Sequence, residues 1–173
     1  MAESSTPEAA CSEMGALAEA HKNFEVFVGT FKAEVKMWMG PGEPMVSTGV
    51  MVNTLELGGR FLRQVYKGDD AGGPFPNFEG RGYLGFNTTA EQYEGFWIDS
   101  ACTLMQHETG TLDASGKTWN MAGTMTDPQT QKPMEKRSVT TVQDQDHHSM
   151  EMFFTSAEDP ESKCMEIHYT RVK

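Results

Sequence analysis

Residues 30–57 decide the fold class, and they read TFKAEVKMWMGPGEPMVSTGVMVNTLEL. Apolar side chains occupy every second position in the first part of this stretch: Phe31, Ala33, Val35 and Met37. Side chains of a strand point alternately to opposite faces, so this alternation predicts a strand with one buried face. The glycine- and proline-rich residues 40–44 supply turn chemistry, and a second run follows over residues 45–57. The stretch therefore predicts two antiparallel neighbouring strands.

The same alternation of runs and turns continues to the end of the chain. The predicted strands cover residues 30–39, 45–57, 60–67, 78–86, 93–99, 101–111, 117–126, 134–142, 147–155 and 163–172. No convincing helix separates them, and parallel pairs need long crossovers, so neighbouring strands pair antiparallel. A meander this long must hide its edges, which closure into a barrel achieves. We expect an all-β fold, an antiparallel up-and-down β-barrel of about ten strands.

The start of the chain has a different composition. Residues 1–12 are rich in Ala, Glu, Ser and Thr, which predicts a disordered tail. Ser12 can cap a short amphipathic helix that ends near Phe24, because Met14, Leu17 and Ala18 follow at helical spacing. Residues 13–173 are then one domain, since a chain of 173 residues has the usual size of one.

Charge and composition argue against several classes of partner. The formal net charge of -11 disfavours nucleic acid and anionic membranes, which attract clustered Lys and Arg. No apolar run approaches the roughly 18 residues that span a bilayer, and residues 1–10 do not resemble a signal peptide. The three cysteines lack the spacing of a disulfide framework or zinc site. We expect a cytoplasmic protein, either a monomer or a homodimer.

Residues 27–32, FVGTFK, resemble the opening of the lipocalins and fatty-acid-binding proteins. In those families a short helical segment leads into a Gly-x-Trp motif, and a basic residue of the last strand packs against the tryptophan. The resemblance implies a lipocalin-like barrel in which Phe31 replaces the tryptophan and Arg171 is the basic residue. Phe31 and Arg171 would then be a barrel-closing pair, and a guanidinium over an aromatic face contributes roughly 0.5–2 kcal/mol.

A second resemblance runs from about residue 27 to residue 171. Its segments are VKMW (35–38), LGGRFL (57–62), FWIDS (96–100) and TDPQT (126–130). Together they look like an uncharacterised bacterial family, a numbered domain of unknown function placed in the calycin superfamily. The resemblance implies the barrel and brings no activity.

Several residues could line a ligand pocket inside such a barrel. Methionine is frequent, with 13 residues, and it suits either an adaptable apolar pocket or gap-filling in a packed core. An inward arginine could bind a ligand carboxylate, whereas an outward one would pair across strands. Trp97 and Asp99 share a face and could offer a stacking platform and an acceptor. The candidate ligand-binding residues are Met37, Arg63, Arg81, Tyr83, Trp97, Asp99, Trp119, Met121 and Met152.

The histidines raise the question of a metal ion or haem. His147 and His148 are adjacent, so in a strand they face opposite ways and cannot chelate one ion. The place of His168 on the last strand is similar to that of the iron ligand in nitrobindins, which are haem-binding barrels. The glycine-rich N-terminal motif of nitrobindins is missing here, and His168 faces outward if Arg171 points inward. We expect no metal and no cofactor, with haem at His168 as the alternative.

No enzyme motif is found: Ser100 lacks a Gly-x-Ser-x-Gly elbow, and neither a phosphate loop nor a His-Glu-x-x-His pair occurs. The leading hypothesis is a binding protein that holds a small, mostly apolar molecule inside the barrel. The alternatives are a haem-binding barrel, an enzyme that uses an inward histidine or carboxylate as general base on a small apolar substrate, and a filled barrel that acts through protein–protein contacts.

Overall fold

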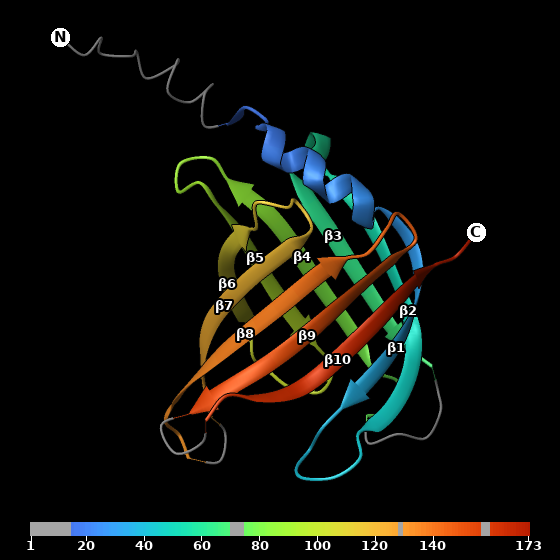
Figure 1. The fold of residues 1–173 in the computed structure, drawn as a ribbon, viewed down its shortest axis with the longest axis vertical. Coiled ribbons are helices and arrows are strands. Elements are labelled where there is room, and N and C mark those ends of the chain that lie inside the picture. The colour runs from blue at the N-terminus through green and yellow to red at the C-terminus, as the bar shows by residue number, and fades with distance from the viewer. Residues whose placement is uncertain (1–14, 70–74, 128–129, 157–159) are drawn as a thin grey trace, which may run out of the picture.

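Ten antiparallel strands close into a single barrel in the computed structural model (Figure 1), as the sequence predicts. The structure describes residues 15–69, 75–127, 130–156 and 160–173. The elements are η1 (Glu19–Phe27), β1 (Gly29–Met37), β2 (Met45–Glu56), η2 (Leu57–Gly59), β3 (Phe61–Gly68), β4 (Glu79–Asn87), β5 (Gln92–Asp99), β6 (Gln106–Leu112), β7 (Thr118–Thr126), β8 (Pro133–Val142), β9 (His147–Ser156) and β10 (Ser162–Arg171). The predicted tail, residues 1–12, lies outside the described residues.

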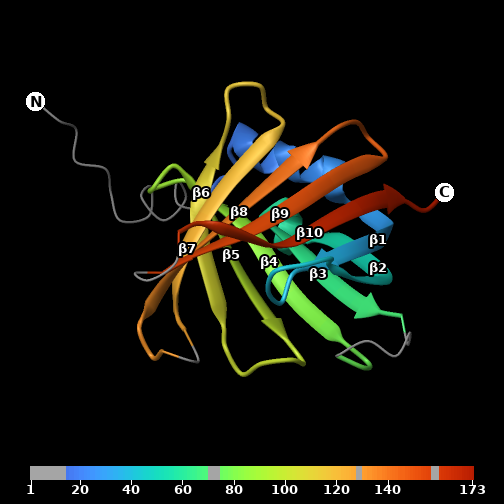
Figure 2. The ribbon, with the colours of Figure 1, turned by 60° about the horizontal axis from the view of Figure 1, so that its bottom comes forward.

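Each strand pairs with the next one along the chain, and the barrel closes between the first strand and the last. β1 and β10 pair antiparallel from Phe31 opposite Arg171 to Met37 opposite Met165. Figure 2 shows these two strands side by side. Closure gives every one of the ten strands two neighbours, which satisfies the backbone groups that an open sheet would leave at its edges.

A short helix, η1, covers one end of the barrel (Figure 1). The sequence predicted a helix from Ser12 to about Phe24. The structure instead gives a 3₁₀ helix from Glu19 to Phe27, and residues 1–14 are not described. Its buried side chains, His21, Phe24 and Phe27, recur at every third position. Three residues per turn place them on one face, so the 3₁₀ form seals the barrel better than an α-helix would. None of the described helices is long and apolar enough to cross a membrane.

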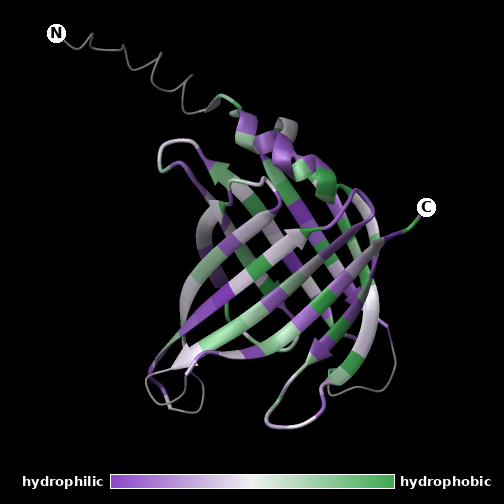
Figure 3. Ribbon diagram, in the orientation of Figure 1, coloured by the Kyte–Doolittle hydropathy of each residue, from purple (hydrophilic) through white to green (hydrophobic). Residues whose placement is uncertain are grey.

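Alternate side chains of each strand point into the barrel, and the alternation of hydropathy is visible along the strands in Figure 3. The buried residues form two clusters. One lies under η1 and comprises Phe24, Phe27, Leu62, Tyr93, Trp119, Met121 and Val142. The other lies mainly along β1 and β10 and comprises Phe31, Ala33, Val35, Met51, Tyr66, Ile167 and Tyr169. The barrel wall is thus well packed under the helix and along the closing seam.

The register of β4 and β5 explains why the inner face of the middle strands is hard to read from the sequence. Gly82 lies opposite Trp97, and Gly80 lies opposite Asp99, so the inner face of β4 carries glycines there. The indole of Trp97 occupies the space that side chains at Gly80 and Gly82 would fill. The predicted strand over residues 101–111 begins later, at Gln106, because Asp99 accepts backbone hydrogen bonds from Ala101 and Cys102 and starts a turn.

Candidate ligand-binding site

Six of the predicted ligand-binding residues face the interior. Met37, Trp97, Asp99, Trp119, Met121 and Met152 all stand on the inner face of their strands, as their register with other buried residues shows. They do not form one cluster. Trp119 and Met121 are buried under η1, whereas Trp97 and Asp99 lie at the lower end of β5, opposite η1. Asp99 also accepts a hydrogen bond from the Trp97 indole at 3.1 Å, so its carboxylate has local partners already.

Arg63, Arg81 and Tyr83 lie on the outer face, which corrects the prediction that they line the interior. Arg63 lies 3.5 Å from Glu56, and the Tyr83 hydroxyl donates to the same carboxylate at 2.9 Å. This hydrogen bond is the main cause of the raised pKa of Tyr83. Arg81 pairs with Glu79 at 3.2 Å. The physical reason is that glycines, which give no apolar signal, occupy the inner positions between these side chains.

A buried charged group on the inner face is Lys136 of β8. Only 5% of its surface is exposed, and no other lysine or arginine among the described residues is buried. Its Nζ donates to Gln106 Oε1 at 2.8 Å and lies 3.4 Å from Glu108 Oε1. Ser138 Oγ donates to the same Glu108 oxygen at 2.8 Å. We call these four residues the Lys136 cluster.

The Lys136 cluster joins β8 to β6 across the intervening strand β7. Lys136 lies opposite Gly123 of β7, and because Gly123 has no side chain, the long lysine side chain can cross that strand on the inside. A Cβ at Gly123 would also overlap the carbonyl oxygen of His107. The sequence pattern did not predict this cluster. The available signal was Gly123 itself, which interrupts the inward row of Trp119, Met121 and Met125 where a side chain would otherwise stand.

Partly buried side chains line the middle of the barrel. Thr140 lies opposite Met150, and Met150 lies opposite the buried Ile167, so all three face inward from the middle of their strands. Thr140 and Met150 nevertheless keep part of their surface accessible. The middle of the inner wall is therefore less completely buried than the residues of the two clusters.

His148, on β9, faces the interior near the helical end. Its ring stacks on Tyr169 with centroids 4.4 Å apart and packs edge-on against Phe27 and Phe31. Within the described residues its ring nitrogens have no hydrogen-bond partner. Burial, and to a smaller extent the charge of Arg171, lowers its pKa to about 3. An imidazole with this pKa is neutral at physiological pH and is a weak base, so it suits packing better than general-base catalysis.

His168 lies outside the barrel, which corrects the haem alternative. Its side chain is 53% exposed, and its Nε2 lies 2.7 Å from Glu166 Oε1 on the outer surface. His168 therefore does not reach the interior, because Tyr169 is the neighbour that points inward. At the turn before β9, the His147 ring pairs with Asp144 at 2.9 Å. No group of three metal-ligating side chains comes together in the described ranges.

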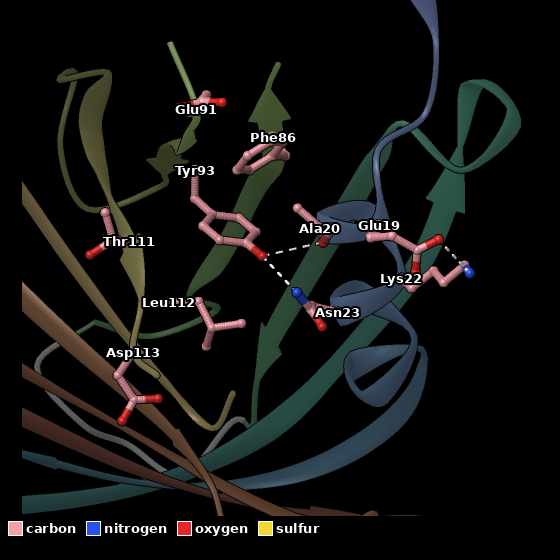
Figure 4. Close-up of a pocket in the computed structure, with 10 residues that line it drawn as sticks. All are labelled: Glu19, Ala20, Lys22, Asn23, Phe86, Glu91, Tyr93, Thr111, Leu112 and Asp113. Atoms are coloured by element: carbon pink, nitrogen blue, oxygen red, sulfur yellow. Dashed lines mark hydrogen bonds and ion pairs between the residues drawn. The ribbon is translucent and has the colours of Figure 1, made fainter. Parts of the chain in front are cut away.

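Two pockets accompany this geometry. The larger, about 510 Å³, is a groove between η1 and the ends of β4, β5 and β6 (Figure 4). Several of its polar groups already have partners, since Asn23 donates to the Tyr93 hydroxyl at 2.9 Å and Lys22 pairs with Glu19. The smaller pocket, about 90 Å³, lies between the lower ends of β6 and β7. It is lined by residues 104–107 and 123–126 and by Lys136, so it leads directly to the buried charge.

Most of the chain is similar to one protein family. Residues 17–171 match a family described as a protein of unknown function, DUF1579. The chain belongs to the DUF1579 family. The predicted membership of a numbered family of unknown function is thus confirmed, and its place in the calycin superfamily stays a prediction.

The wider comparisons of this DUF1579 protein concern its fold. No curated protein matches the chain. Among solved structures it is similar to the crystal structure of Rv2717c from M. tuberculosis, with a TM-score of 0.65 and 14% sequence identity. The match covers 91% of this chain and 100% of the other. At this identity the likeness shows a shared fold alone.

Proposed function

We propose that this protein binds a small, mostly apolar molecule inside the barrel and holds its polar group against the Lys136 cluster. The observation that carries the proposal is a buried lysine on the inner wall of a barrel whose middle is lined by partly buried side chains. Lysine is almost never buried without a partner. Apolar residues would fill the same volume at less cost than a buried ion pair. A charged pair at this place is therefore better suited to recognition than to filling the barrel.

The rest of the inner wall suits an apolar molecule of variable shape. Met150 and Met152 on β9 and Met165 on β10 face inward as register neighbours. Phe154 lies opposite Lys136, so an apolar ring borders the charged group. Methionine side chains are flexible and polarizable and adapt to different ligands. Trp97 supplies a flat apolar surface on the opposite part of the wall.

Binding of the neutral, environment-sensitive dye Nile red tests this proposal. We expect the fluorescence of the dye to rise with the wild-type protein and with a Thr155→Trp control, because Thr155 faces outward beside Glu135. We expect no rise with Met150→Trp or Thr140→Phe, which place bulk in the centre of the barrel. Circular dichroism and thermal unfolding verify that each variant folds, since overpacking alone costs roughly 1–3 kcal/mol. Equal dye binding by folded Met150→Trp and wild-type protein would overturn the proposal.

A further inference from the structure

We infer that the Lys136 cluster recognises a neutral polar group with an acceptor and a donor side by side, such as a primary carboxamide, and not a carboxylate. This inference rests on the proposed binding function and names the class of ligand. It follows from three features: the charge balance of the cluster, its unused hydrogen-bonding atoms, and the size of the pocket beside it.

The charge of Lys136 is already balanced. Its Nζ lies 3.4 Å from Glu108 Oε1, and the part of the chain that the structure describes contains no other buried lysine or arginine. Arg171 faces the opposite end of the barrel, where backbone carbonyls occupy its guanidinium. A ligand carboxylate next to Lys136 would bring a second negative charge beside Glu108. Like charges in a partly buried site disfavour each other's ionised form, so a charged acid fits poorly.

The cluster leaves one donor and one acceptor unused. A lysine ammonium has three donors, of which one reaches Gln106 and one points to Glu108. Glu108 Oε1 accepts from Ser138 and pairs with Lys136, whereas no side chain or backbone group among the described residues donates a hydrogen bond to its Oε2. A primary carboxamide matches this pair of unused groups, because its oxygen accepts from the ammonium while its nitrogen donates to the carboxylate.

The pocket between β6 and β7 is the right size for such a group. Its volume of about 90 Å³ holds a few heavy atoms, since one water molecule takes roughly 30 Å³ of liquid. The ladder between β6 and β7 runs from Thr109 opposite Ala122 to Leu112 opposite Trp119. Below it, Gly123 and Lys136 both line the pocket. The apolar tail would extend from the pocket into the barrel, towards Phe154 and the inward methionines.

Isothermal titration of the wild-type protein with octanamide and octanoate, which share one tail, tests the inference at pH 7.5. We expect octanamide to bind at least about tenfold more tightly, the usual size of one hydrogen bond to a charged group. The Glu108→Gln variant leaves Lys136 as an unpaired positive charge, so we expect its preference to reverse towards octanoate. Glu135→Gln, an outward change on β8, is the matched control and should keep the wild-type preference.

A second variant covers the case in which Glu108→Gln fails to fold. Lys136→Met combined with Glu108→Gln removes both charges together, and we expect it to bind octanamide about tenfold more weakly than wild type does. Lys67→Met, on the outer face of β3, should change nothing. Octanoate binding as tightly as octanamide to the wild type, or unchanged preference in folded Glu108→Gln, would overturn the inference while leaving the proposed function standing. Failure of Nile red and both octyl compounds to bind would reject the proposed function itself.

Discussion

The guanidinium carbon of Arg171 lies 4.4 Å above the centre of the Phe31 ring, so the last strand clamps the first from inside the barrel. The same guanidinium donates to the carbonyl oxygens of Val26 in the last turn of η1, of Val28 directly after it, and of Gln145 in the turn before β9. One side chain therefore connects η1, the β1–β10 pair and the turn before β9. Its contribution is expected to be mainly structural.

Replacing Arg171 with methionine should lower the free energy of unfolding by roughly 2–4 kcal/mol. Several charge-assisted hydrogen bonds are lost at once, and three backbone carbonyls lose their partner. Urea denaturation followed by tryptophan fluorescence measures the change. Lys173→Met is the control, because Lys173 is 85% exposed and pairs with the same Asp146 carboxylate that Arg171 approaches. A loss below 0.5 kcal/mol for Arg171→Met, the usual size of a surface effect, would contradict the proposed role.

Gly80→Ala should destabilise the barrel because a Cβ at this position would overlap the indole of Trp97. Overpacking of this kind costs roughly 1–3 kcal/mol. Replacing Trp97 with leucine in the same chain should recover most of that loss, since the smaller side chain leaves room. A double-mutant cycle by chemical denaturation measures the coupling. Additive effects of Gly80→Ala and Trp97→Leu would show that the contact is not the cause.

The pH dependence of stability should carry a component from His148. Its pKa is about 3 in the folded protein and 6.5 as a free side chain, so between these values only the unfolded chain binds the proton. The stabilising effect of the neutral ring is therefore complete above pH 6.5 and is lost as the pH falls towards 3. From pH 7.5 to pH 4 the wild type should lose roughly 2–4 kcal/mol more than His148→Phe. Parallel stability curves for the two proteins would refute this assignment.

Glu166 should also stabilise the folded protein, and its contribution should be lost at lower pH than that of His148. Hydrogen bonds from Lys163 and then His168 lower the pKa of Glu166 from 4.5 to about 2. The contribution is present above pH 4.5 and disappears as the pH falls through 2, because only then is the folded carboxylate protonated. Glu166→Gln should be less stable than wild type at pH 7 and equal to it near pH 2. Thermal unfolding at these two pH values measures the difference in stability. An equal difference between the two proteins at both pH values would contradict the prediction.

The strands and turns of this barrel were predictable because the sequence patterns that mark them are local. Alternation in residues such as Phe31, Ala33 and Val35 fixes the buried face of β1, and glycine–proline turns mark the strand ends. Neither depends on distant parts of the chain. The helix was placed too early in the chain, because the threefold spacing of His21, Phe24 and Phe27 becomes meaningful only once they are seen to plug the barrel.

The inner wall was less predictable because it depends on pairs of strands. Gly80 and Gly123 give no hydropathy signal, yet a side chain at Gly80 would overlap the Trp97 indole, and one at Gly123, the register partner of Lys136, would overlap the His107 carbonyl. A glycine that leaves room for a partner on the next strand cannot be distinguished in one sequence from a glycine at a turn or bulge. Arg63 and Arg81 were therefore assigned to the interior, while Lys136, the buried cation, was passed over.

The pairing of β1 with β10 has a consequence for synthesis on the ribosome. The barrel joins its first strand to its last, so a nascent chain presents two bare strand edges until β10 has emerged. Such edges invite pairing with other chains. Slow translation of the final strand, or a premature stop before it, would prolong this exposure. We would then expect holding chaperones to bind the chain as an open sheet that has not closed into a barrel.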